Sequence, residues 1–429
     1  MLTTSPTTET AERLETGILE IAAYRDASRP GWTREVFSEA YRESRQWTVQ
    51  RMTDAGLEVH TDQAGNIVGR LPGTNPNAPA LVTGSHTDTV DGGGRFDGIV
   101  GVLGAIDAVR QLRQSDTVLT RDLLVVDFFG EESNPYGLSC LGSRAAVGEL
   151  TVEDLDRTDY RGVTLGRSYS DYGLDPASIL SSDWARSTAL HAFLELHIEQ
   201  GPTLEQRGLP LGIVTGIAGI QRLLAVFTGS PDHAGTRPMT ERADAMVAAA
   251  EAVLAVRREG CGAPTHGVAT TTRIESESRS PNVVPSLVRM TSEVRSVDAE
   301  WLSGVKGRLA QEILGQARHH GVDVDFTWST DNEVVQTHPG VHDTAARVAD
   351  TLGIPWMPVP SGATHDAVHM ATLAPMGMIF IPSAGGKSHC PEEWTDFTDT
   401  ATGVTALAHT LIALDQAPLT RHSVPLEQP

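Results

Sequence analysis

The segment GSHTDTVDGGGRFDGIVGV (residues 84–102) decides the fold of this chain. The four residues before it, ALVT, are an apolar run that predicts a buried strand. Apolar residues at helical spacing predict a helix that begins near Ile99. His86 and Asp88 are therefore expected at a strand end and Asp97 just before a helix, where open α/β sheets bind ligands.

These residue types have the chemistry of a metal site. His86 can bind a cation through one imidazole nitrogen, while Asp88 can hold the other nitrogen and fix the tautomer. Asp97 can bridge two metals if the glycines at 92–94 turn the loop back, since glycine tolerates positive φ. The alternative is a solvated loop with an incidental histidine, which the whole ordered string disfavours.

The composition limits the classes of partner. The chain has 429 residues, enough for two or more domains, and a formal net charge of −22. Nucleic acids and anionic membranes bind basic faces, so neither is expected as a partner. Cys140, Cys261 and Cys390 are too few and too widely spaced for a disulfide framework. With no long apolar run and no apolar leader segment, we expect a cytoplasmic protein.

Three further segments place metal-binding side chains just past predicted strands. One apolar strand leads into Glu131 and Glu132, whose neighbouring carboxylates leave the strand in different directions. An alternating strand ends at His197, and His389 follows another apolar strand. Alone, each fits an exposed acidic turn or a core histidine. Together with the first segment they supply five ligands, and five ligands that share one carboxylate suit two metals about 3.5–4 Å apart.

The pattern changes character near residue 216. Residues 1–215 and 332–429 alternate buried strands with helices and predict a discontinuous α/β domain. Residues 216–331 predict a compact α+β unit inserted into that domain. Its expected strands are 223–229, 267–274, 286–295 and 322–328, and its expected helices are 239–258 and 300–319.

The remaining elements belong to the discontinuous domain. Residues 150–190 are polar and predict an irregular surface excursion. The other expected elements are two helices within 9–56, a hairpin over 57–71, strands at 80–83, 123–129 and 192–197, a helix at 341–352, a strand at 376–381 and a closing helix at 398–414.

Seven motifs carry a resemblance to a known family: residues 84–98, 131–132, 142–145, 195–201, 232–235, 281–285 and 388–392. They resemble the two-metal amidohydrolases that include N-carbamoyl-L-amino acid hydrolases, β-ureidopropionases and allantoate amidohydrolases, which are relatives of aminoacylases and co-catalytic zinc peptidases. The resemblance covers nearly the whole chain. His197 favours the carbamoylase branch, because related peptidases usually carry Asp or Glu there.

The resemblance implies an architecture and a metal content. The discontinuous domain would be zinc-peptidase-like with a mixed central sheet, and the inserted domain would form a homodimer and close over the site as a lid. Each subunit would hold two divalent metal ions, first Zn²⁺, with Mn²⁺, Co²⁺ or Ni²⁺ also able to bind such ligands. One metal would be bound by His86, Asp97 and His197, and the other by Asp97, Glu132 and His389.

The resemblance also implies roles for residues near the metals. Glu131 would be the general base that takes a proton from the attacking water. His233 would reach the active site of the partner subunit and stabilise the developing oxyanion. Arg295 would bind the α-carboxylate of the substrate through its guanidinium fork. The substrate pocket would be completed by Gln200, Asn282 and Gly362.

Several positions depart from the family pattern. Residues 133–136 read Ser-Asn-Pro-Tyr where Gly-Ser-Arg-Phe is frequent, and Thr364 stands where Gly is usual. Glu293 replaces a frequent Asp, and Arg295 also fits a structural ion pair with Glu293. These departures spare the predicted ligands and base, and they bear on the substrate pocket.

The expected activity is hydrolysis of the carbamoyl C–N bond of an N-carbamoyl-L-amino acid to the amino acid, CO₂ and ammonia. The expected partner is a small ureido or amide substrate that carries a carboxylate. Allantoate hydrolysis and an aminoacylase or dipeptidase activity are the alternatives within the enzymes. A non-catalytic member of the fold, used for binding or assembly, is disfavoured because no predicted ligand and no base is missing.

Overall fold

A computed structural model of the protein describes residues 5, 7–182 and 184–419. The chain divides into two compact units, the first made of Met1–Thr215, Thr337–Val359 and His365–Pro429, and the second of Gly216–Gln336 and Pro360–Thr364. The second unit exceeds the predicted range 216–331 because residues 360–364 hydrogen-bond within it. Ala218 N–H donates to Ser361 O, and the Thr364 hydroxyl donates to Asn332.

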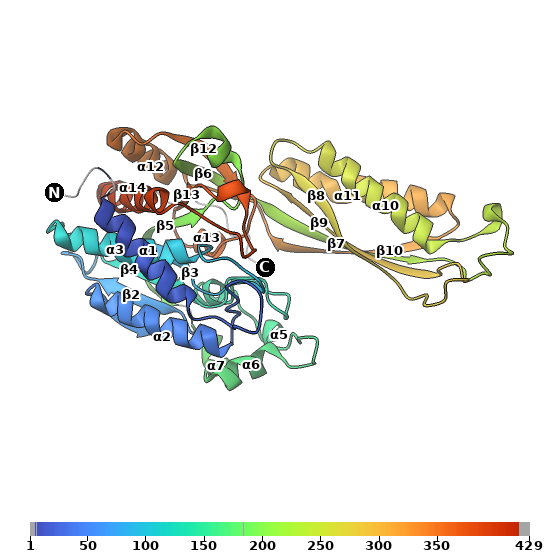
Figure 1. The fold of residues 1–429 in the computed structure, drawn as a ribbon, viewed down its shortest axis with the longest axis horizontal. Coiled ribbons are helices and arrows are strands. Elements are labelled where there is room, and N and C mark those ends of the chain that lie inside the picture. Colours follow the sequence, from blue (N-terminus) through green and yellow to red (C-terminus); the bar gives the residue numbers. More distant parts are fainter. Residues whose placement is uncertain (1–4, 6, 183, 420–429) are drawn as a thin grey trace. The chain divides into compact units, whose positions relative to one another are not determined.

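The first unit contains a mixed sheet and several helices (Figure 1). Its strands are β1 (Glu58–Thr61), β2 (Ile67–Leu71), β3 (Ala80–His86), β4 (Leu123–Phe128), β5 (Leu190–Ile198), β6 (Leu211–Ile217), β12 (Trp356–Ser361) and β13 (Met376–Ile381). The short β11 (Val335–Gln336), which pairs with the end of β6, falls within residues 216–336 of the second unit. Its longer helices are α1 (Thr8–Ala22), α2 (Glu39–Asp54), α3 (Ile99–Gln114), α12 (Pro339–Leu352) and α14 (Phe397–Gln416).

Short helices complete this unit. They are α4 (Leu141–Ala146), α5 (Val152–Leu155), α6 (Leu165–Tyr172), α7 (Pro176–Ile179), α8 (Trp184–Ser187), α9 (Thr203–Arg207), α13 (Ala367–Met370) and the 3₁₀ turn η2 (Ala384–Gly386). The predicted irregular excursion over 150–190 was wrong. It holds α5 to α8, and Leu155, Leu165 and Ile179 are buried in a cluster with Phe129. Polar residues between these buried apolar residues obscured their spacing in the sequence.

The order of the strands explains their apolar sequences. The sheet runs β1-β2-β4-β3-β5-β13-β6-β11, with β12 beside β6. β3 is parallel to β4 and β5, and β13 is parallel to β5. Every residue of β3, β4, β5 and β13 is buried, so both faces of the sheet are covered, as is usual for parallel strands.

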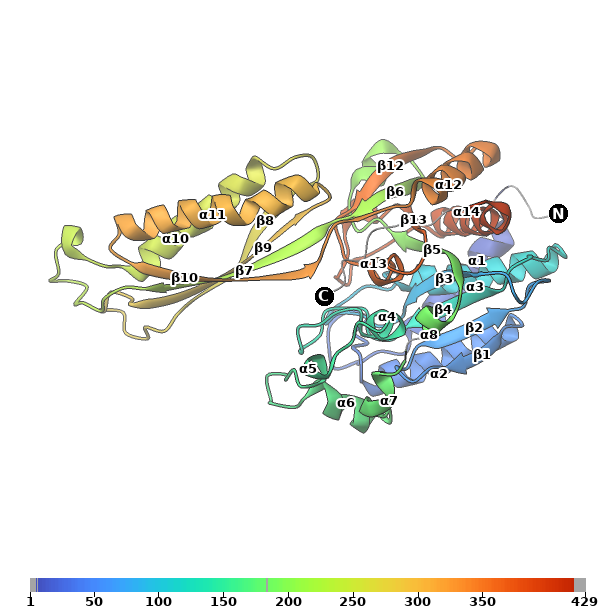
Figure 2. The same ribbon diagram turned by 180° about the vertical axis from the view of Figure 1, so that it is seen from behind.

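One hydrophobic core joins the sheet to its helices. α1, α3, α12 and α14 share that core with β3, β5 and β13 (Figure 1). α4 contacts β4, and α13 contacts β5 and β13 (Figure 2). This packing leaves the carboxyl ends of the parallel strands as the edge from which polar loops emerge.

The second unit is a four-stranded antiparallel sheet with two long helices. The strands run in the order β10-β7-β9-β8, namely Asp323–Asn332, Gly219–Thr228, Leu287–Ser296 and Val268–Ser276. The helices are α10 (Ala245–Cys261) and α11 (Ala299–His319). The predicted α/β class, with a mixed central sheet and a separate four-stranded α+β unit, is confirmed.

The first helix of this unit begins later than expected. The sequence predicts a helix from residue 239, but Met239–Glu241 forms only a 3₁₀ turn. α10 begins at Ala245 because the Asp244 side chain accepts the N–H groups of Met246 and Val247 as an N-cap. Within the described part of the chain, no helix has the length and apolar character needed to cross a membrane.

Candidate metal centre

Parallel strands deliver the predicted ligands to one edge of the central sheet. His86 is the last residue of β3, and His197 is the next-to-last residue of β5. Glu131 and Glu132 follow the end of β4, and His389 lies in the segment after β13. Since parallel strands have their carboxyl ends at the same edge, side chains from four distant segments meet there.

Asp97 joins two groups of ligand atoms. Its Oδ1 lies 3.1 Å from His197 Nε2, and its Oδ2 lies 3.0 Å from His389 Nε2. Glu132 Oε1 lies 3.4 Å from the same nitrogen of His389. Ligand atoms of His86, Asp97 and His197 lie within 4.8 Å of one another, and so do those of Asp97, Glu132 and His389. The structure thus brings together the two predicted sets, whose metal binding stays a prediction.

The donor set fits a pair of divalent cations. Imidazole nitrogens with carboxylate oxygens are ligands for Zn²⁺ and for the neighbouring transition metals. The side chains of His86, Asp97 and His197 are 3%, 5% and 1% exposed, so these polar groups have little contact with water. Burying several ionisable groups together is costly unless they pair or bind a cation.

Mutual charge shifts the pKa values in this cluster. The hydrogen bond that His389 donates to the Asp97 carboxylate raises the pKa of His389 to about 9, against the opposing effect of burial. Burial raises the pKa of Glu132 to about 7, and the nearby Asp97 carboxylate adds to the rise. Burial alone would lower the pKa of His86, but the Glu131 carboxylate and its neighbours outweigh it and raise that pKa. A bound cation would have to displace these protons.

Glu131 lies beside the ligand groups but belongs to neither. Its Oε2 is 3.5 Å from His86 Nε2, and the residue is 6% exposed. Burial raises the pKa of Glu131 well above the usual range of a glutamate, although the His86 imidazole opposes the rise. The Cys140 thiol lies 3.5 Å from its Oε1. A buried carboxylate with a raised pKa next to the ligands has the properties of a general base.

Asp88 supports the site in a different way from the one expected. His86 Nδ1 lies 3.1 Å from the backbone carbonyl of Asp88 and 3.5 Å from its carboxylate. The carboxylate instead accepts the backbone N–H groups of Glu131 and Glu132, at 3.2 and 3.1 Å. Asp88 therefore orients the histidine through its main chain and holds the two glutamates through its side chain.

The loop before Asp97 is held by a residue that the sequence analysis did not single out. The carboxylate of Glu393 accepts the N–H groups of Phe96 and Asp97, at 2.8 and 3.1 Å. A Cβ on Gly94 would lie 2.0 Å from Glu393 Oε1, so this contact requires glycine. Of the three glycines expected at positive φ, only Gly92 adopts it, with φ 69°. The position of Glu393 just after a predicted ligand was its only signal.

A further carboxylate and histidine lie behind His197. The His365 ring packs edge-on against the His197 ring with centroids 4.6 Å apart, and burial lowers the pKa of His365 well below its usual value. Glu195 is fully buried, and its Oε1 accepts the Ser85 hydroxyl at 2.7 Å. Ligand atoms of Glu195, His197 and His365 form a third group within 4.8 Å. Glu195 stands two residues before His197 on one strand face, which was the available signal.

Gln200 is the one predicted substrate residue within the first unit. Its Nε2 donates to Asp97 Oδ2 at 2.9 Å and to the Ser388 hydroxyl oxygen at 3.2 Å. The Ser388 hydroxyl donates to Glu393 at 2.9 Å. Gln200 therefore contacts the carboxylate shared by both ligand groups, and its binding of substrate is a prediction.

Arg295 and Gly362 meet within the second unit. Arg295 Nε lies 2.8 Å from Glu293 Oε1, and its Nη1 donates to Gly362 O at 3.0 Å. The ion pair with Glu293 that the sequence left open is therefore present. This ion pair uses one side of the guanidinium, so Arg295 can pair with Glu293 and also bind a substrate.

His233 and Asn282 also lie close together in the second unit. His233 pairs with Val283 in an isolated β-bridge, and Ala234 N–H donates to Asn282 O at 2.9 Å. Both His233 and Asn282 are exposed. Their loops are thus held to each other while the two side chains remain open to solvent.

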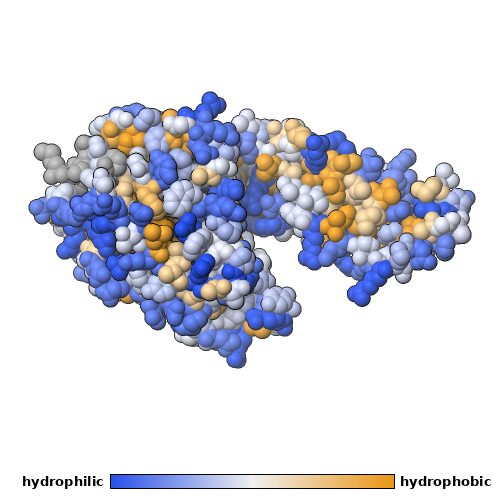
Figure 3. All heavy atoms as spheres, in the orientation of Figure 1, coloured by the Kyte–Doolittle hydropathy of each residue, from blue (hydrophilic) through white to orange (hydrophobic). Residues whose placement is uncertain are grey.

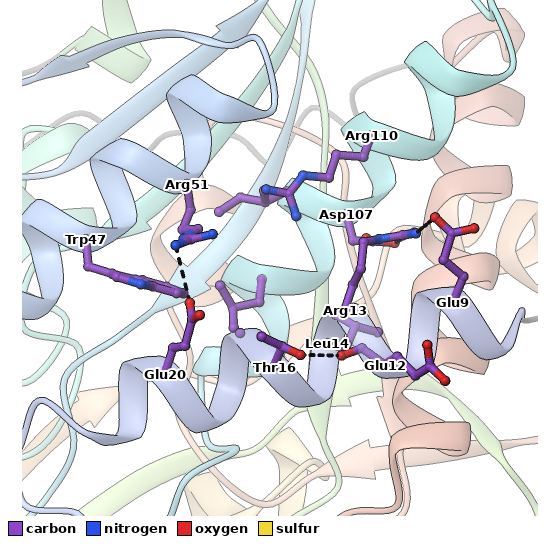
Figure 4. A pocket seen from close by; sticks show the side chains of 13 residues that line it. Glu9, Glu12, Arg13, Leu14, Thr16, Glu20, Trp47, Arg51, Asp107 and Arg110 are labelled. Carbon is purple, nitrogen blue, oxygen red and sulfur yellow. Dashed lines mark hydrogen bonds and ion pairs between the residues drawn. The ribbon is translucent and has the colours of Figure 1, made fainter.

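An open cavity of about 360 Å³ lies elsewhere in the first unit, between α1, α2 and α3 (Figure 4). Arg13 pairs with Glu9 and Asp107, and Arg51 pairs with Glu20. These charges offset one another, and the lining residues differ from the predicted ligands and base. We assign this cavity no part in the reaction.

The sequence of the chain matches a known family over most of its length. The profile described as Peptidase family M20/M25/M40 matches residues 80–413. The chain belongs to this family. The M20 fold accounts for the mixed sheet with its separate four-stranded unit.

Curated relatives and solved structures agree with this assignment. The N-carbamoyl-L-amino-acid amidohydrolase of Paenarthrobacter aurescens is 36% identical over 95% of this chain and 98% of its own length. The ureidoglycolate hydrolase of Arabidopsis thaliana is 36% identical over 94% of this chain and 86% of its own length. A hydantoinase/carbamoylase family amidase from Burkholderia multivorans is 30% identical, with a TM-score of 0.85 over 95% of this chain and 98% of that structure. The predicted family and the prediction of a hydrolase acting on linear amide C–N bonds are confirmed.

Proposed function

We propose that this enzyme hydrolyses the carbamoyl C–N bond of N-carbamoyl-L-amino acids, giving the amino acid, CO₂ and ammonia, with two divalent metal ions per subunit. The observation that supports it best is the position of Asp97, whose two oxygens reach His197 and His389 in separate ligand groups. Zn²⁺ is the first choice of metal, followed by Mn²⁺, Co²⁺ and Ni²⁺. Three unpaired cysteines among the described residues support a reducing, cytoplasmic location.

Glu131 acts as the general base in this proposal. When bound, the two cations supply Lewis acidity and lower the pKa of water. Glu131, next to but outside both ligand groups, takes a proton from the water that attacks the carbamoyl carbon. It then returns the proton to the leaving amino nitrogen. Asp88 keeps the Glu131 backbone in place through its hydrogen bond to Glu131 N–H.

Residues of both units recognise the substrate in this proposal. Arg295 binds the α-carboxylate, since a planar guanidinium matches a carboxylate in two parallel hydrogen bonds. Gln200 contacts the ureido group near Asp97, and Asn282 and Gly362 complete the pocket. His233 of the partner subunit stabilises the negative charge that develops on the carbamoyl oxygen.

The surface of the second unit supports a homodimer. Among the strands of the described residues, β8 lies at an edge of its sheet and pairs with β9, and such an edge can pair with another chain. Val247 and Leu254 on α10 are 39% and 48% exposed, and Val268 and Ile274 on β8 are 51% and 42% exposed. Figure 3 shows orange, apolar spheres gathered on this unit. We propose that α10 and β8 form the dimer contact and that the same unit closes over the site as a lid.

A substrate panel with the metal-reconstituted enzyme tests the proposal. The panel contains N-carbamoyl-L-amino acids, allantoate, ureidoglycolate, N-acyl amino acids and dipeptides, with release of ammonia and free amino acid as the readout. We expect the highest kcat/KM with an N-carbamoyl-L-amino acid. A higher kcat/KM with allantoate or ureidoglycolate would support hydrolysis of a ureido compound but would identify a different substrate. Activity confined to N-acyl amino acids or dipeptides would refute the proposal.

A further inference from the structure

The connection between α1 and α2 is long for a compact unit. It runs from residue 23 to residue 38 without a helix or strand. Connections of this length are uncommon unless they have a function. Residues 29–34 of this connection lie along residues 87–95, the segment that leads from His86 to Asp97.

Backbone groups hold the two segments together. A Cβ on Gly31, which has φ 64°, would lie 2.7 Å from Gly92 O, so the two backbones touch. Several hydrogen bonds cross between the segments, among them those from Trp32 N–H to Gly93 O at 3.0 Å, from Thr89 N–H to Arg34 O at 3.1 Å and from Gly92 N–H to Thr33 Oγ1 at 2.8 Å.

Arg34 is the centre of this contact. It is fully buried, and its Nε donates to Thr87 O at 2.7 Å, one residue beyond His86. Its Nη1 donates to Ile21 O and Tyr24 O, carbonyls at and just beyond the carboxyl end of α1, at 3.1 and 2.9 Å. One guanidinium therefore ties the end of a core helix to the beginning of the metal-binding loop.

Charged and aromatic side chains extend the contact toward Asp97. Arg29 forms an ion pair with Asp91 at 2.6 Å. The Arg95 guanidinium lies over the Trp32 ring, 4.6 Å from its centroid, and over the Trp394 ring at 5.0 Å. These contacts therefore hold the loop between His86 and Asp97 at several points along its length.

We propose that residues 29–34 are a brace that sets the positions of His86 and Asp97 before metal binds, with Arg34 as a positioning residue. The proposal rests on the metal site of the proposed function. A loop with three consecutive glycines has high conformational freedom, so it needs external contacts to present a ligand in one position. Fixing the loop in advance lowers the entropic cost of binding the cation.

The test measures cobalt binding and loop exchange without substrate. Arg34→Lys keeps the charge, but an ammonium group cannot reproduce the planar fork that bonds Thr87 O, Ile21 O and Tyr24 O. Thr33→Val is an isosteric second variant, in case the arginine variant does not fold. It removes a hydroxyl that accepts Gly92 N–H, donates to Pro30 O at 2.8 Å and lies 3.4 Å from Asp91 Oδ1. Thr48→Val is the matched control, because Thr48 is equally buried but its hydroxyl bonds Ser44 O within α2.

We expect Arg34→Lys to weaken Co²⁺ affinity by about 10–100-fold, the usual effect of removing a group that orients metal ligands. It should also change the visible spectrum of the bound Co²⁺ and speed amide exchange over 87–95 in the metal-free protein. Thr33→Val should act in the same direction by less than about 10-fold, while Thr48→Val matches the wild type.

The proposed brace would be overturned if folded Arg34→Lys matched the wild type in Co²⁺ affinity, in the visible spectrum of bound Co²⁺ and in amide exchange over 87–95. If Arg34→Lys does not fold, the same result in Thr33→Val would overturn it. A wild-type protein that binds two Co²⁺ ions but hydrolyses no ureido compound would refute the proposed function, and the brace would still be judged by these variants.

Discussion

The two parts of the proposed active site are held in different ways. At the sheet edge of the first unit, His86, Asp97 and His197 are buried, and their ligand atoms lie within 4.8 Å of one another. In the second unit, His233 and Asn282 are exposed, and their loops are held through backbone contacts. The first group has a complete set of metal donors within one unit, whereas the second group has no donor set of its own.

This difference separates two kinds of chemistry. A buried, fully shaped ligand set binds a cation with little rearrangement, because its geometry is fixed by the fold. Exposed residues on loops become part of a site only when another surface meets them. We therefore expect the first group to control metal content and the second to control turnover and substrate affinity.

Metal removal should have the largest effect. Chelation should reduce hydrolysis to background, because the proposed nucleophile is a water molecule whose pKa the metals lower. Adding Zn²⁺, Mn²⁺, Co²⁺ or Ni²⁺ should restore activity, as followed by ammonia release and metal analysis. Full activity in a sample verified to be free of metal would break the proposed division of roles.

The adjacent glutamates should separate metal binding from proton transfer. Glu131→Gln should keep both metals and lose turnover by several orders of magnitude, since the proton acceptor is gone. Glu132→Ala should lose metal, as measured by elemental analysis. If Glu131→Gln empties the site and Glu132→Gln does not, the two roles are reversed.

His233 tests whether the second unit serves another subunit. His233→Ala should keep both metals and the dimer but lose about 10²–10³-fold in rate, the usual cost of one oxyanion donor. Mixed with Glu131→Gln subunits, it should form hybrid dimers in which one of two sites is intact. Activity of the hybrids should then approach half that of the wild type. Hybrids shown to form but lacking activity would place His233 with its own subunit or outside catalysis.

Arg295 can be compared with a neighbour that shares its carboxylate partner. Arg295→Lys should lower kcat/KM by about 10–100-fold, mainly through KM, because hydrogen bonds to charged groups contribute about 1.5–3 kcal/mol. Arg222 also pairs with Glu293, at 2.9 Å, so Arg222→Lys is the matched control. Equal KM values for the two variants would assign Arg295 a structural role.

The pH dependence of metal affinity tests the first group without any substitution. The pKa of His389 is raised to about 9 and that of Glu132 to about 7, so both groups hold protons below those values. A metal must displace these protons, so its affinity should rise as pH increases from 6 to 9, by up to about tenfold per unit for each proton displaced. Calorimetry in buffers of different ionisation enthalpy measures the protons released. If metal binding released no protons at pH 6.5, that result would contradict the raised pKa values of His389 and Glu132.

Much of the metal centre could be predicted because its signals are local. His86, Glu132 and His197 stand at or just past the end of an apolar strand, whereas Asp97 stands just before a helix. Strands with parallel neighbours place their ends together. β13, predicted at 376–381, is observed as Met376–Ile381. The start of α10 was predicted too early, at the apolar residue Met239. The N-cap at Asp244 instead makes the helix begin at Ala245.

The supporting contacts could not be read from the sequence for a physical reason. Glu393 and Arg34 act largely on backbone atoms of the loop that carries Asp97. Any residue supplies backbone N–H and C=O groups, so such contacts leave no pattern in the partner segment. The role of Asp88 was half predicted, since its spacing shows nearness to His86 but not which of its oxygens is closer.

The place of β13 in the sheet has a consequence for synthesis on the ribosome. β13 lies between β5 and β6, although the whole second unit separates β5 from β13 along the chain. During synthesis, one edge of β5 therefore lacks its final neighbour until β13 has been made. The strands of the second unit are synthesised before β13 and can already pair with one another. His389 emerges after β13, so the ligand set that contains it is completed only after the whole second unit has been synthesised. In the proposed function, metal loading at that set is therefore a step of maturation. A chain that stops before β13 exposes an apolar strand edge to chaperones and proteases.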